Sequence, residues 1–461
     1  MYDIIIIGGG PGGYHMAALA AQKNKKVAVI EAHKLGGTCL NYGCIPSKAF
    51  IHYSNILAKA NGAVQKGAIN GEQMTLNHEY VVESKDKNVA MLIKGTEMKV
   101  KKSGAEIIKG WAKILPPKEE EFRVEVNDEI LTCKDLVIAT GSKVFVPNFI
   151  NGAKENYRPG DVSSPILTSN EILSLKEVPK ELVVIGAGVI GLELGTYFTY
   201  VGTKVTIIDI SSKIAGPFDT EISNAFQNRW EKKGVNFILE SKVTEVSAGK
   251  VKYEDKDGNE HEITCDKILM SVGRKPNSET LGLENIPDLK VENGYVKTDN
   301  KLRTSVPHVY AIGDVNGVFQ LAHTAYREGE VALSTILGNG EKMNYEAIPS
   351  VIYGKPEISE IGFNEDVAKE KGLNFRVMKL SMLYSGRAVV ENSVSSGEVV
   401  KLIINNNDDR IIGFSMFGAY ASELVGVGTV IIGMKFDIND IKKLVFAHPS
   451  IGELFKDIVN H

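Results

Sequence analysis

Two segments of this 461-residue chain repeat one design: a buried strand, a glycine-rich loop, a helix, a second buried strand and an acidic residue. The first loop is Gly8–Gly13, and Glu31 follows its first glycine by 23 residues. The second loop is Gly186–Gly191, and Asp209 follows its first glycine by the same 23 residues. This full context, rather than the glycines alone, predicts two dinucleotide-binding units.

Each residue of such a loop has its own role. Gly8 allows the tight turn, Gly10 lets a pyrophosphate approach, and Gly13 lets the helix pack on the strand. Glu31 can then accept a hydrogen bond from a ribose hydroxyl. In the second loop the corresponding glycines are Gly186, Gly188 and Gly191. Asp209 would repel the 2′-phosphate of NADP, and the next residues include no arginine, so the second unit favours NAD.

Cys39 and Cys44 lie just after the first loop, in the string GGTCLNYGCIPSK. Four cysteines are too few for a disulfide scaffold, and Cys133 and Cys265 give no second close pair to complete a metal site. If Ser47–Ala60 is helical, Cys44 lies near the helix N-terminus, where the dipole favours a thiolate. We therefore expect a redox pair, with no metal, beside one flavin and one nicotinamide nucleotide.

The length predicts about three domains. Val309–Asp314 has the pattern of a buried strand that returns the chain to the first nucleotide domain, so the second domain is inserted in the first. We expect the first domain over 1–146 and 274–345, the second over 147–273, and a C-terminal domain over 346–461. Alternation in Val399–Ile404 predicts an antiparallel sheet with helices on one side in that last domain. The fold class is α/β, with two Rossmann-like domains and a C-terminal α+β dimerisation domain.

Composition and hydropathy exclude several classes of partner. The net charge is −4, which does not suggest a nucleic-acid surface or a basic membrane-binding stretch. The apolar runs are far shorter than a membrane span, and a strand pattern starts at Tyr2, where a signal segment would need an apolar region. We expect a cytoplasmic protein with no nucleic-acid and no membrane partner.

With these residues in view, the chain resembles the dihydrolipoyl dehydrogenases over essentially its whole length. The string from Cys39 to Lys48 is highly specific to that group. The other matching segments are Gly8–Gly13, Ala139–Gly141, Gly186–Gly195, Val272–Asn277, Ala311–Asp314, Leu321–His323, Ile348–Tyr353 and His448–Glu453. The resemblance implies FAD in the first domain, NAD in the second, and a homodimer. One departure is His15–Met16, where the family usually has small or aliphatic residues.

The resemblance also implies a division of roles in catalysis. Cys39 would exchange with a dithiol substrate, and Cys44 would face the flavin. His448, oriented by Glu453, would act as a base in the active site of the partner subunit. Histidine titrates near neutral pH, which suits such a base, although a histidine with a nearby glutamate is also compatible with a purely structural role.

Lys48 and Glu193 are the remaining catalytic candidates, and both are also candidates for cofactor binding. Glu193 is either a favourable contact with a helix dipole or the ion-pair partner of Lys48 beside the flavin. Backbone amides at His323, where a helix begins, could stabilise negative charge on the flavin ring. The other expected cofactor contacts are Thr38, Ala112, Thr140, Gly141, Val243, Gly273, Asp314 and Ala322.

The implied reaction is oxidation of protein-bound dihydrolipoamide to lipoamide, with reduction of NAD+. Lipoylated proteins of a 2-oxo acid dehydrogenase complex or of a glycine cleavage system would be the partners. Another small disulfide as substrate, and a non-catalytic flavin redox sensor, are the alternatives. Glutathione reductase-like enzymes usually carry basic residues where this chain has Asp209, mercuric reductases add a cysteine pair after Cys265, and soluble transhydrogenases lack the full pair.

Overall fold

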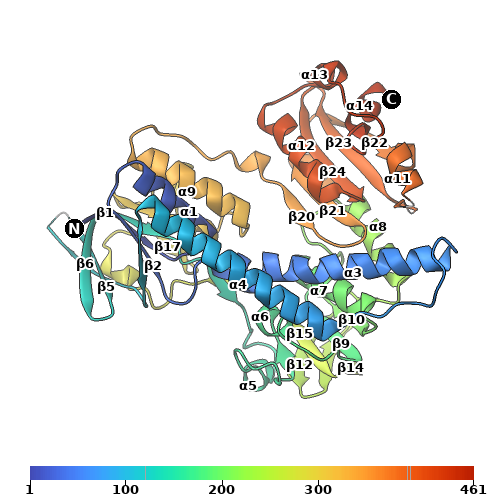
Figure 1. Ribbon diagram of the computed structural model, residues 1–461, viewed down its shortest axis with the longest axis horizontal. Helices are drawn as coiled ribbons and strands as arrows, with labels where there is room; N and C mark the ends of the chain where they lie inside the picture. The colour runs from blue at the N-terminus through green and yellow to red at the C-terminus, as the bar shows by residue number, and fades with distance from the viewer. Residues whose placement is uncertain (120, 392, 395) are drawn as a thin grey trace. The chain divides into compact units, whose positions relative to one another are not determined.

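The computed structural model describes residues 1–119, 121–391, 393–394 and 396–461. It forms two compact units, each assembled from three segments (Figure 1). The first unit contains Met1–Ala49, Tyr80–Phe145 and Gly273–Met343, and the second contains Phe50–Glu79, Val146–Val272 and Asn344–His461. The second unit therefore contains both the inserted nucleotide fold and the C-terminal sheet.

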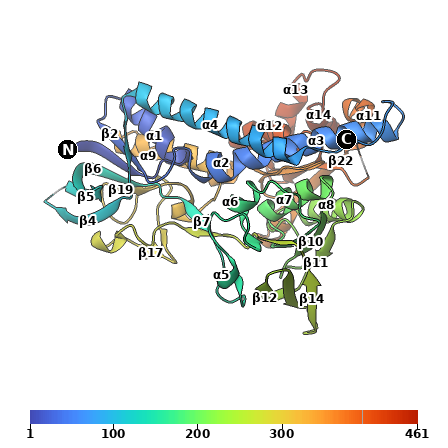
Figure 2. The same ribbon diagram turned by 60° about the horizontal axis from the view of Figure 1, so that its bottom comes forward.

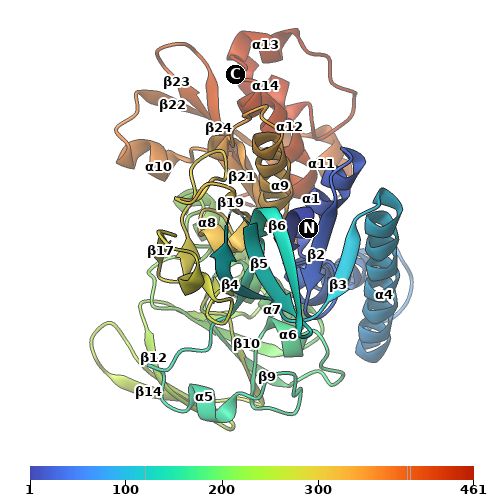
Figure 3. The same cartoon turned by 90° about the vertical axis from the view of Figure 1, so that its left-hand side faces the viewer.

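The first unit is built on one mixed sheet with the order β3-β2-β1-β6-β5-β4, and β19 pairs with β6 (Figure 3). The pairs β3–β2, β2–β1, β1–β6 and β6–β19 are parallel. The pairs β6–β5 and β5–β4 are antiparallel. The strands are β1 (Tyr2–Ile7), β2 (Val27–Glu31), β3 (Glu106–Lys109), β4 (Lys113–Lys118), β5 (Glu121–Val126), β6 (Glu129–Ile138) and β19 (Val309–Ala311). The pairing of β19 with β6 confirms that the chain returns to the first nucleotide fold after the insertion.

Helices complete the first unit. α1 packs against α9, and a side chain at Gly329 of α9 would come within 3.0 Å of the Gly12 oxygen of α1. The helices are α1 (Pro11–Gln22), α2 (Gly37–Tyr42), α4 (His78–Ser103) and α9 (Ala322–Ile336), and α3 (Cys44–Gln65) runs on into the second unit. Short elements are β7 (Ser142–Val144), β16 (Arg274–Pro276), η1 (Leu283–Asn285), β17 (Val291–Glu292), β18 (Tyr295–Val296) and η2 (Gly313–Asn316).

The second unit repeats the nucleotide fold in a parallel sheet of order β11-β10-β9-β15-β8, of which β10 and β11 are labelled in Figure 2. Its strands are β8 (Ile166–Leu167), β9 (Glu181–Ile185), β10 (Lys204–Ile208), β11 (Asn236–Ile238) and β15 (Lys267–Met270). A separate antiparallel sheet contains β12 (Lys242–Ser247), β13 (Lys250–Glu254) and β14 (Glu260–Thr264). Its helices are α5 (Ala153–Asn156), α6 (Ser169–Ile172), α7 (Val189–Tyr200) and α8 (Thr220–Glu231). Both predicted strand–loop–helix–strand units are therefore present.

The C-terminal part is an antiparallel sheet of order β20-β21-β24-β23-β22, as predicted. Its strands are β20 (Ser350–Ile352), β21 (Glu357–Gly362), β22 (Phe375–Ser381), β23 (Val399–Asn405) and β24 (Ile411–Gly418). Its helices are η3 (Tyr345–Ala347), α10 (Glu365–Glu370), η4 (Met382–Tyr384), α11 (Gly386–Val390), α12 (Ala421–Gly433), α13 (Ile438–Lys443) and α14 (Leu454–Asn460). β23 differs from the alternation expected for it, because Val400 to Ile404 are all buried.

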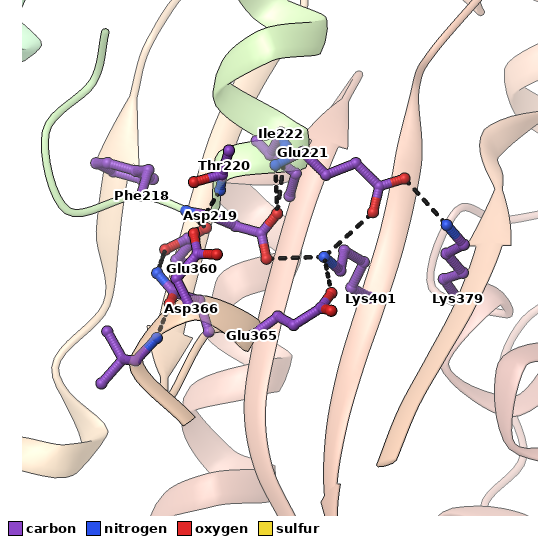
Figure 4. Close-up of polar contacts among 12 residues, drawn as sticks. Phe218, Asp219, Thr220, Glu221, Ile222, Glu360, Glu365, Asp366, Lys379 and Lys401 are labelled. Carbon is purple, nitrogen blue, oxygen red and sulfur yellow. Dashed lines mark hydrogen bonds and ion pairs between the residues drawn. The ribbon is translucent and has the colours of Figure 1, made fainter. Parts of the chain in front are cut away.

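The burial of β23 on both faces includes a lysine. The side chain of Lys401 is 1% exposed, and its Nζ lies 2.8 Å from Asp219, whose side chain is 2% exposed (Figure 4). The same Nζ lies 2.8 Å from Glu365 and 3.2 Å from Glu221. These contacts join α8 of the nucleotide fold to β23 and α10 of the C-terminal part within the second unit. A buried ammonium is tolerated here because several carboxylates compensate its charge.

A neighbouring carboxyl group belongs to the same arrangement. Glu360 on β21 accepts a hydrogen bond from the backbone N–H of Asp219 at 2.7 Å and another from Asn364 at 3.1 Å. Burial is the main reason why the pKa of Glu360 is raised to about 7. Asp219 in turn caps α8 by accepting hydrogen bonds from the backbone N–H groups of Glu221 and Ile222. The start of α8 is thus fixed by side chains that the C-terminal sheet provides.

Replacing Lys401 by methionine should destabilise the protein strongly. The change keeps the apolar stem but leaves the buried Asp219 carboxylate without its cation, which costs about 3–5 kcal/mol. Lys379→Met is the matched control, because Lys379 is 58% exposed and its ion pair among the described residues is with Glu221, at 3.1 Å. The control should cost no more than about 1 kcal/mol. Urea unfolding followed by tryptophan fluorescence measures both changes in stability, and equal shifts in the two variants would contradict this account.

Candidate active site

The first glycine loop is held by close packing at one glycine and is open at another. A Cβ atom on Gly13 would lie 1.9 Å from the carbonyl oxygen of Gly8, so only glycine fits there. A Cβ on Gly10 would meet only the Cα of Gly37, at 3.9 Å, among the described atoms. Gly10 is also the N-cap of α1, where no described side chain caps the helix. The open space therefore lies at a helix start that no described side chain caps, which is the arrangement that binds a pyrophosphate.

Glu31 closes this loop at the end of β2. One carboxylate oxygen accepts a hydrogen bond from the backbone N–H of Gly9 at 2.8 Å, and the other accepts one from His33 at 2.8 Å. The carboxylate is therefore fixed beside the loop, at the position where a ribose hydroxyl could donate to it.

The second loop has the same construction. A Cβ on Gly191 would lie 2.1 Å from the Gly186 oxygen, whereas a Cβ on Gly188 would have no described atom within 4 Å. Gly188 is the N-cap of α7, and within the described chain no side chain caps that helix either. Asp209 accepts hydrogen bonds from the backbone N–H groups of Ala187 at 2.6 Å and Ser211 at 2.7 Å. The two units thus share their packing as well as their sequence spacing.

The two cysteines lie on either side of a helix break in the first unit. Cys39 is in α2, Gly43 ends that helix, and Cys44 is the first residue of α3. The helix begins before the predicted Ser47, and the expected place of Cys44 near its N-terminus is confirmed. Both side chains are partly buried. Hydrogen bonding to Cys44 and burial raise the pKa of Cys39, while the charge of Lys48 acts in the opposite direction. The proton of the reduced pair is therefore held preferentially on Cys39, and Cys44 lies where a helix dipole favours a thiolate.

Arg274 links α2, the helix that contains Cys39, to β7, and the sequence did not predict this link. Its guanidinium donates to the Thr38 hydroxyl at 3.2 Å, next to Cys39, and to the Ser142 hydroxyl at 2.7 Å and carbonyl at 2.8 Å. The Ser142 hydroxyl in turn donates to Asp314. Burial lowers the pKa of Arg274, and the charges of Asp314 and Cys44 offset part of that effect. The motif Val272–Asn277 was the only sequence signal for this role.

A second group that the sequence analysis missed is a pair of tyrosines. The hydroxyls of Tyr14 on α1 and Tyr326 on α9 hydrogen-bond to each other. Burial is the first cause of the raised pKa of Tyr326, and the charges of Cys39 and Cys44 add to it. The departure at His15 belongs to the same group, since its ring packs against Tyr326 and its Nε2 lies 3.1 Å from Glu330.

Predicted cofactor contacts at the end of β6 include an unpartnered polar atom. The hydroxyl of Thr140 is buried and has no hydrogen-bond partner among the described residues. Gly141 follows it with φ of +67° and no described atom within 4 Å of its would-be Cβ. Burial raises the pKa of Asp314, in η2. A polar ligand at this edge would satisfy the Thr140 hydroxyl, which cannot otherwise remain buried without cost.

His448 and Glu453 form the predicted pair within the second unit. His448 Nδ1 lies 2.9 Å from Glu453 Oε1, and the imidazole is 83% exposed in this chain. The other oxygen of Glu453 accepts a hydrogen bond from the Ser450 backbone at 2.8 Å. That bond, followed by His448, lowers the pKa of Glu453. The carboxylate is therefore fixed and charged, and it presents the histidine to the outside.

Glu193 is 4% exposed on α7, and its carboxylate accepts a hydrogen bond from the Tyr353 backbone at 3.1 Å. Lys48 belongs to the first unit and Glu193 to the second, so their pairing stays a prediction. The other predicted residues lie at element ends: Ala112 before β4, Val243 in β12, Gly273 after β15, and Ala322 and His323 at the start of α9. Cys133 and Cys265 are buried.

Known proteins match the chain in both sequence and fold. Residues 2–329 match the family described as pyridine nucleotide-disulphide oxidoreductase, and residues 348–459 match its dimerisation domain. Among solved structures, LpdA from Mycobacterium tuberculosis has a TM-score of 0.89 at 23% identity, covering 100% of this chain and 99% of that one. The HOCl-induced flavoprotein disulfide reductase RclA from Escherichia coli has a TM-score of 0.84 at 25% identity, with the same coverage.

Of the described helices, none is long and apolar enough to cross a membrane.

Curated relatives match over nearly their full length. The mitochondrial dihydrolipoyl dehydrogenase of Dictyostelium discoideum is 36% identical over 467 residues, which cover 99% of this chain and 93% of that protein. The dihydrolipoyl dehydrogenases of Staphylococcus aureus and Geobacillus stearothermophilus are each 36% identical, covering 98% of this chain and 94% of theirs. The chain therefore belongs to the pyridine nucleotide-disulphide oxidoreductase family, and within it to the dihydrolipoyl dehydrogenases.

Proposed function

We propose that the protein oxidises protein-bound dihydrolipoamide to lipoamide and passes the electron pair to NAD+. The observation that carries this proposal is the redox pair Cys39 and Cys44, which is joined to one nucleotide loop in a chain that also contains a second loop selecting NAD. Relatives that are 36% identical over 98–99% of this chain are dihydrolipoyl dehydrogenases, and this supports the choice of dithiol.

The residues present fit two dinucleotides, FAD and NAD. The first loop offers open space in front of an uncapped helix, a fixed Glu31 and the unpartnered hydroxyl of Thr140. The second offers the same space at Gly188 and a fixed Asp209, which suits a free 2′-hydroxyl. FAD held by the first loop would supply two-electron transfer between the cysteine pair and NAD+.

Dithiol oxidation starts from the disulfide form of the cysteine pair. One substrate thiolate attacks Sγ of Cys39, which breaks the bond to Cys44 and leaves that sulfur as a thiolate. The second substrate thiolate then displaces Cys39, so that lipoamide leaves as a cyclic disulfide and both cysteines are reduced. Lys48, whose charge favours the deprotonated form of Cys39, stabilises thiolates in the pair.

A base is needed to form the attacking thiolate. We assign this role to His448 of the partner subunit, because the imidazole is 83% exposed in its own chain and is oriented there by Glu453. The dimerisation domain found over residues 348–459 supports a homodimer, which this arrangement requires. We also propose that Glu193 pairs with Lys48, because a buried carboxylate and an ammonium group stabilise each other.

The partners are lipoylated proteins of a 2-oxo acid dehydrogenase complex or a glycine cleavage system, and the reducing cytoplasm suits a redox pair that must cycle. The domain limits predicted from the sequence (1–146 with 274–345, 147–273 and 346–461) are proposed as the functional divisions. Assays with lipoamide, glutathione and coenzyme A disulfide would separate this substrate from other small disulfides.

Alanine at two glycines of the first loop should give different defects, loss of FAD binding at Gly10 and loss of stability at Gly13. Gly10→Ala adds a methyl that the protein can hold but that fills the space in front of α1, so the variant should fold and bind FAD weakly. Gly13→Ala would place a methyl 1.9 Å from the Gly8 oxygen and should destabilise the fold itself. Thermal unfolding and FAD titration of the apoproteins measure both effects. A Gly10→Ala variant that binds FAD like the wild type would contradict the assigned role.

Asp209 should make the enzyme prefer NAD over NADP, since a 2′-phosphate would meet a carboxylate. Asp209→Ala should weaken the binding of NAD and reduce the difference in kcat/KM between the two nucleotides. Steady-state kinetics with NADH and NADPH in the reverse direction measure this. A wild-type kcat/KM for NADPH that equals or exceeds that for NADH would refute the assignment.

His448→Gln should leave FAD bound and the dimer intact, and should lower lipoamide turnover by about 10²–10⁴-fold. Reduction of artificial electron acceptors by NADH should fall much less, because that path does not use the dithiol. Both activities can be measured on the same holoenzyme preparation, so loss of the two together would indicate general damage.

Mixing two inactive variants tests whether the base is borrowed. Cys44→Ser and His448→Gln subunits, allowed to exchange, form heterodimers in which one active site has both defects and the other has neither. Recovered lipoamide turnover is the expected result. No recovery in heterodimers verified by mass spectrometry would show that His448 serves its own chain or has no role.

A further inference from the structure

Trp111 occupies a distinctive position in the first unit. It lies between β3 and β4, and 65% of it is exposed. Its ring meets the ring of His33 edge-on, with centroids 5.2 Å apart and planes at 84°. Single exposed aromatic residues are common on protein surfaces, so exposure alone carries no functional meaning. The place of Trp111 and His33, just after two strands of the sheet, is the informative feature.

Both aromatic residues follow strands of the nucleotide fold at the same edge. β1, β2 and β3 are parallel neighbours, so their carboxyl ends lie together, and the pairing places Glu31 opposite Lys109. His33 comes two residues after Glu31 and Trp111 two residues after Lys109. Ligands of open α/β sheets bind outside the carboxyl ends of the strands. The aromatic pair is thus at the binding edge, next to the first glycine loop.

Hydrogen bonds fix the pair to the carboxylate that faces the ribose. Glu31 accepts from the backbone N–H of His33 with one oxygen and from Gly9 of the loop with the other, each at 2.8 Å. The backbone N–H of Gly110 donates to the Glu31 carbonyl at 3.0 Å, which places Trp111 directly after that contact. Each ring is therefore attached to Glu31 through a short, hydrogen-bonded stretch of backbone.

The order of groups along the dinucleotide then decides what meets the rings. The pyrophosphate lies at the start of α1 and the ribose at Glu31, so the base attached to that ribose lies beyond Glu31. We propose that Trp111, held by His33, packs against the adenine ring of FAD and makes the site select a whole dinucleotide over FMN. An indole face supports a base well because every base has a polarisable aromatic surface. This inference rests on the FAD site of the proposed function.

Affinity measurements on apoprotein give the first test. Trp111→Ala should lower the affinity for FAD by about 5- to 100-fold, the range expected for loss of one aromatic stacking partner. Trp111→Phe should restore most of that affinity. FMN, which lacks adenine, should bind both variants as it binds the wild type. Phe149→Ala is the matched control, because Phe149 is also 65% exposed but belongs to the second unit, and it should change neither constant.

Fluorescence gives a second test that uses no flavin. The chain has two tryptophans, and Trp230 is only 1% exposed, so Trp230→Phe leaves Trp111 as the single indole. ADP, which carries adenine, ribose and pyrophosphate, should protect Trp111 from acrylamide quenching, whereas ribose 5-phosphate should not. Should Trp230→Phe fold poorly, the same quenching is measured as the difference between wild type and Trp111→Phe.

Several results would overturn the inference. Unchanged FAD affinity in Trp111→Ala, an equal loss for FAD and FMN, or no protection by ADP would each show that the indole does not contact adenine. Lipoamide turnover is not a readout of these experiments. A selective loss of FAD affinity together with a wild-type enzyme inactive on lipoamide would overturn the proposed function and leave the contact with adenine in place.

Discussion

In each nucleotide fold, the helix after the glycine loop packs so closely on the loop that only glycine fits at the contact. The rest of the structure depends on this contact. A side chain on Gly13 or Gly191 would approach the first glycine of its own loop to about 2 Å, at 1.9 and 2.1 Å. Such close packing brings the helix onto the strand and turns its free N–H groups toward the space at Gly10 or Gly188. The binding of both nucleotides, and hence any electron path between them, depends on this single steric feature. It is satisfied twice, 178 residues apart.

Much of this could be predicted from the sequence because the signals are local. The spacing from loop to acid predicted both nucleotide folds, and the pattern at Val309–Ala311 predicted the return strand β19, which pairs with β6. The position of Cys44 at the start of α3 followed from apolar spacing on that helix. Propensity and periodicity act within a few residues, so they are readable without the fold.

The rest could not be predicted because it depends on residues far apart in the sequence. The alternating pattern of β23 predicted one exposed face, but Lys401 is buried because Asp219 and Glu365 reach it from α8 and α10. The link from Arg274 to Thr38 spans 236 positions and has no local pattern. The Tyr14–Tyr326 contact likewise forms only when α1 packs on α9. Side chains that meet across tertiary contacts leave no periodic trace in the sequence.

The buried Lys401 also determines the order in which parts of the second unit can pack during synthesis. Asp219 and Lys401 are separated by 182 positions, so the carboxylate is synthesised long before its cation. At 5–20 residues per second, a ribosome needs about 10–40 s to cover that distance. During this interval β11 and β15 of the second nucleotide fold are still being added, Asp219 has no cation beside it, and α8 cannot yet pack against β23. The nascent chain must therefore keep the start of α8 hydrated until the C-terminal sheet emerges, and only then can the second unit close.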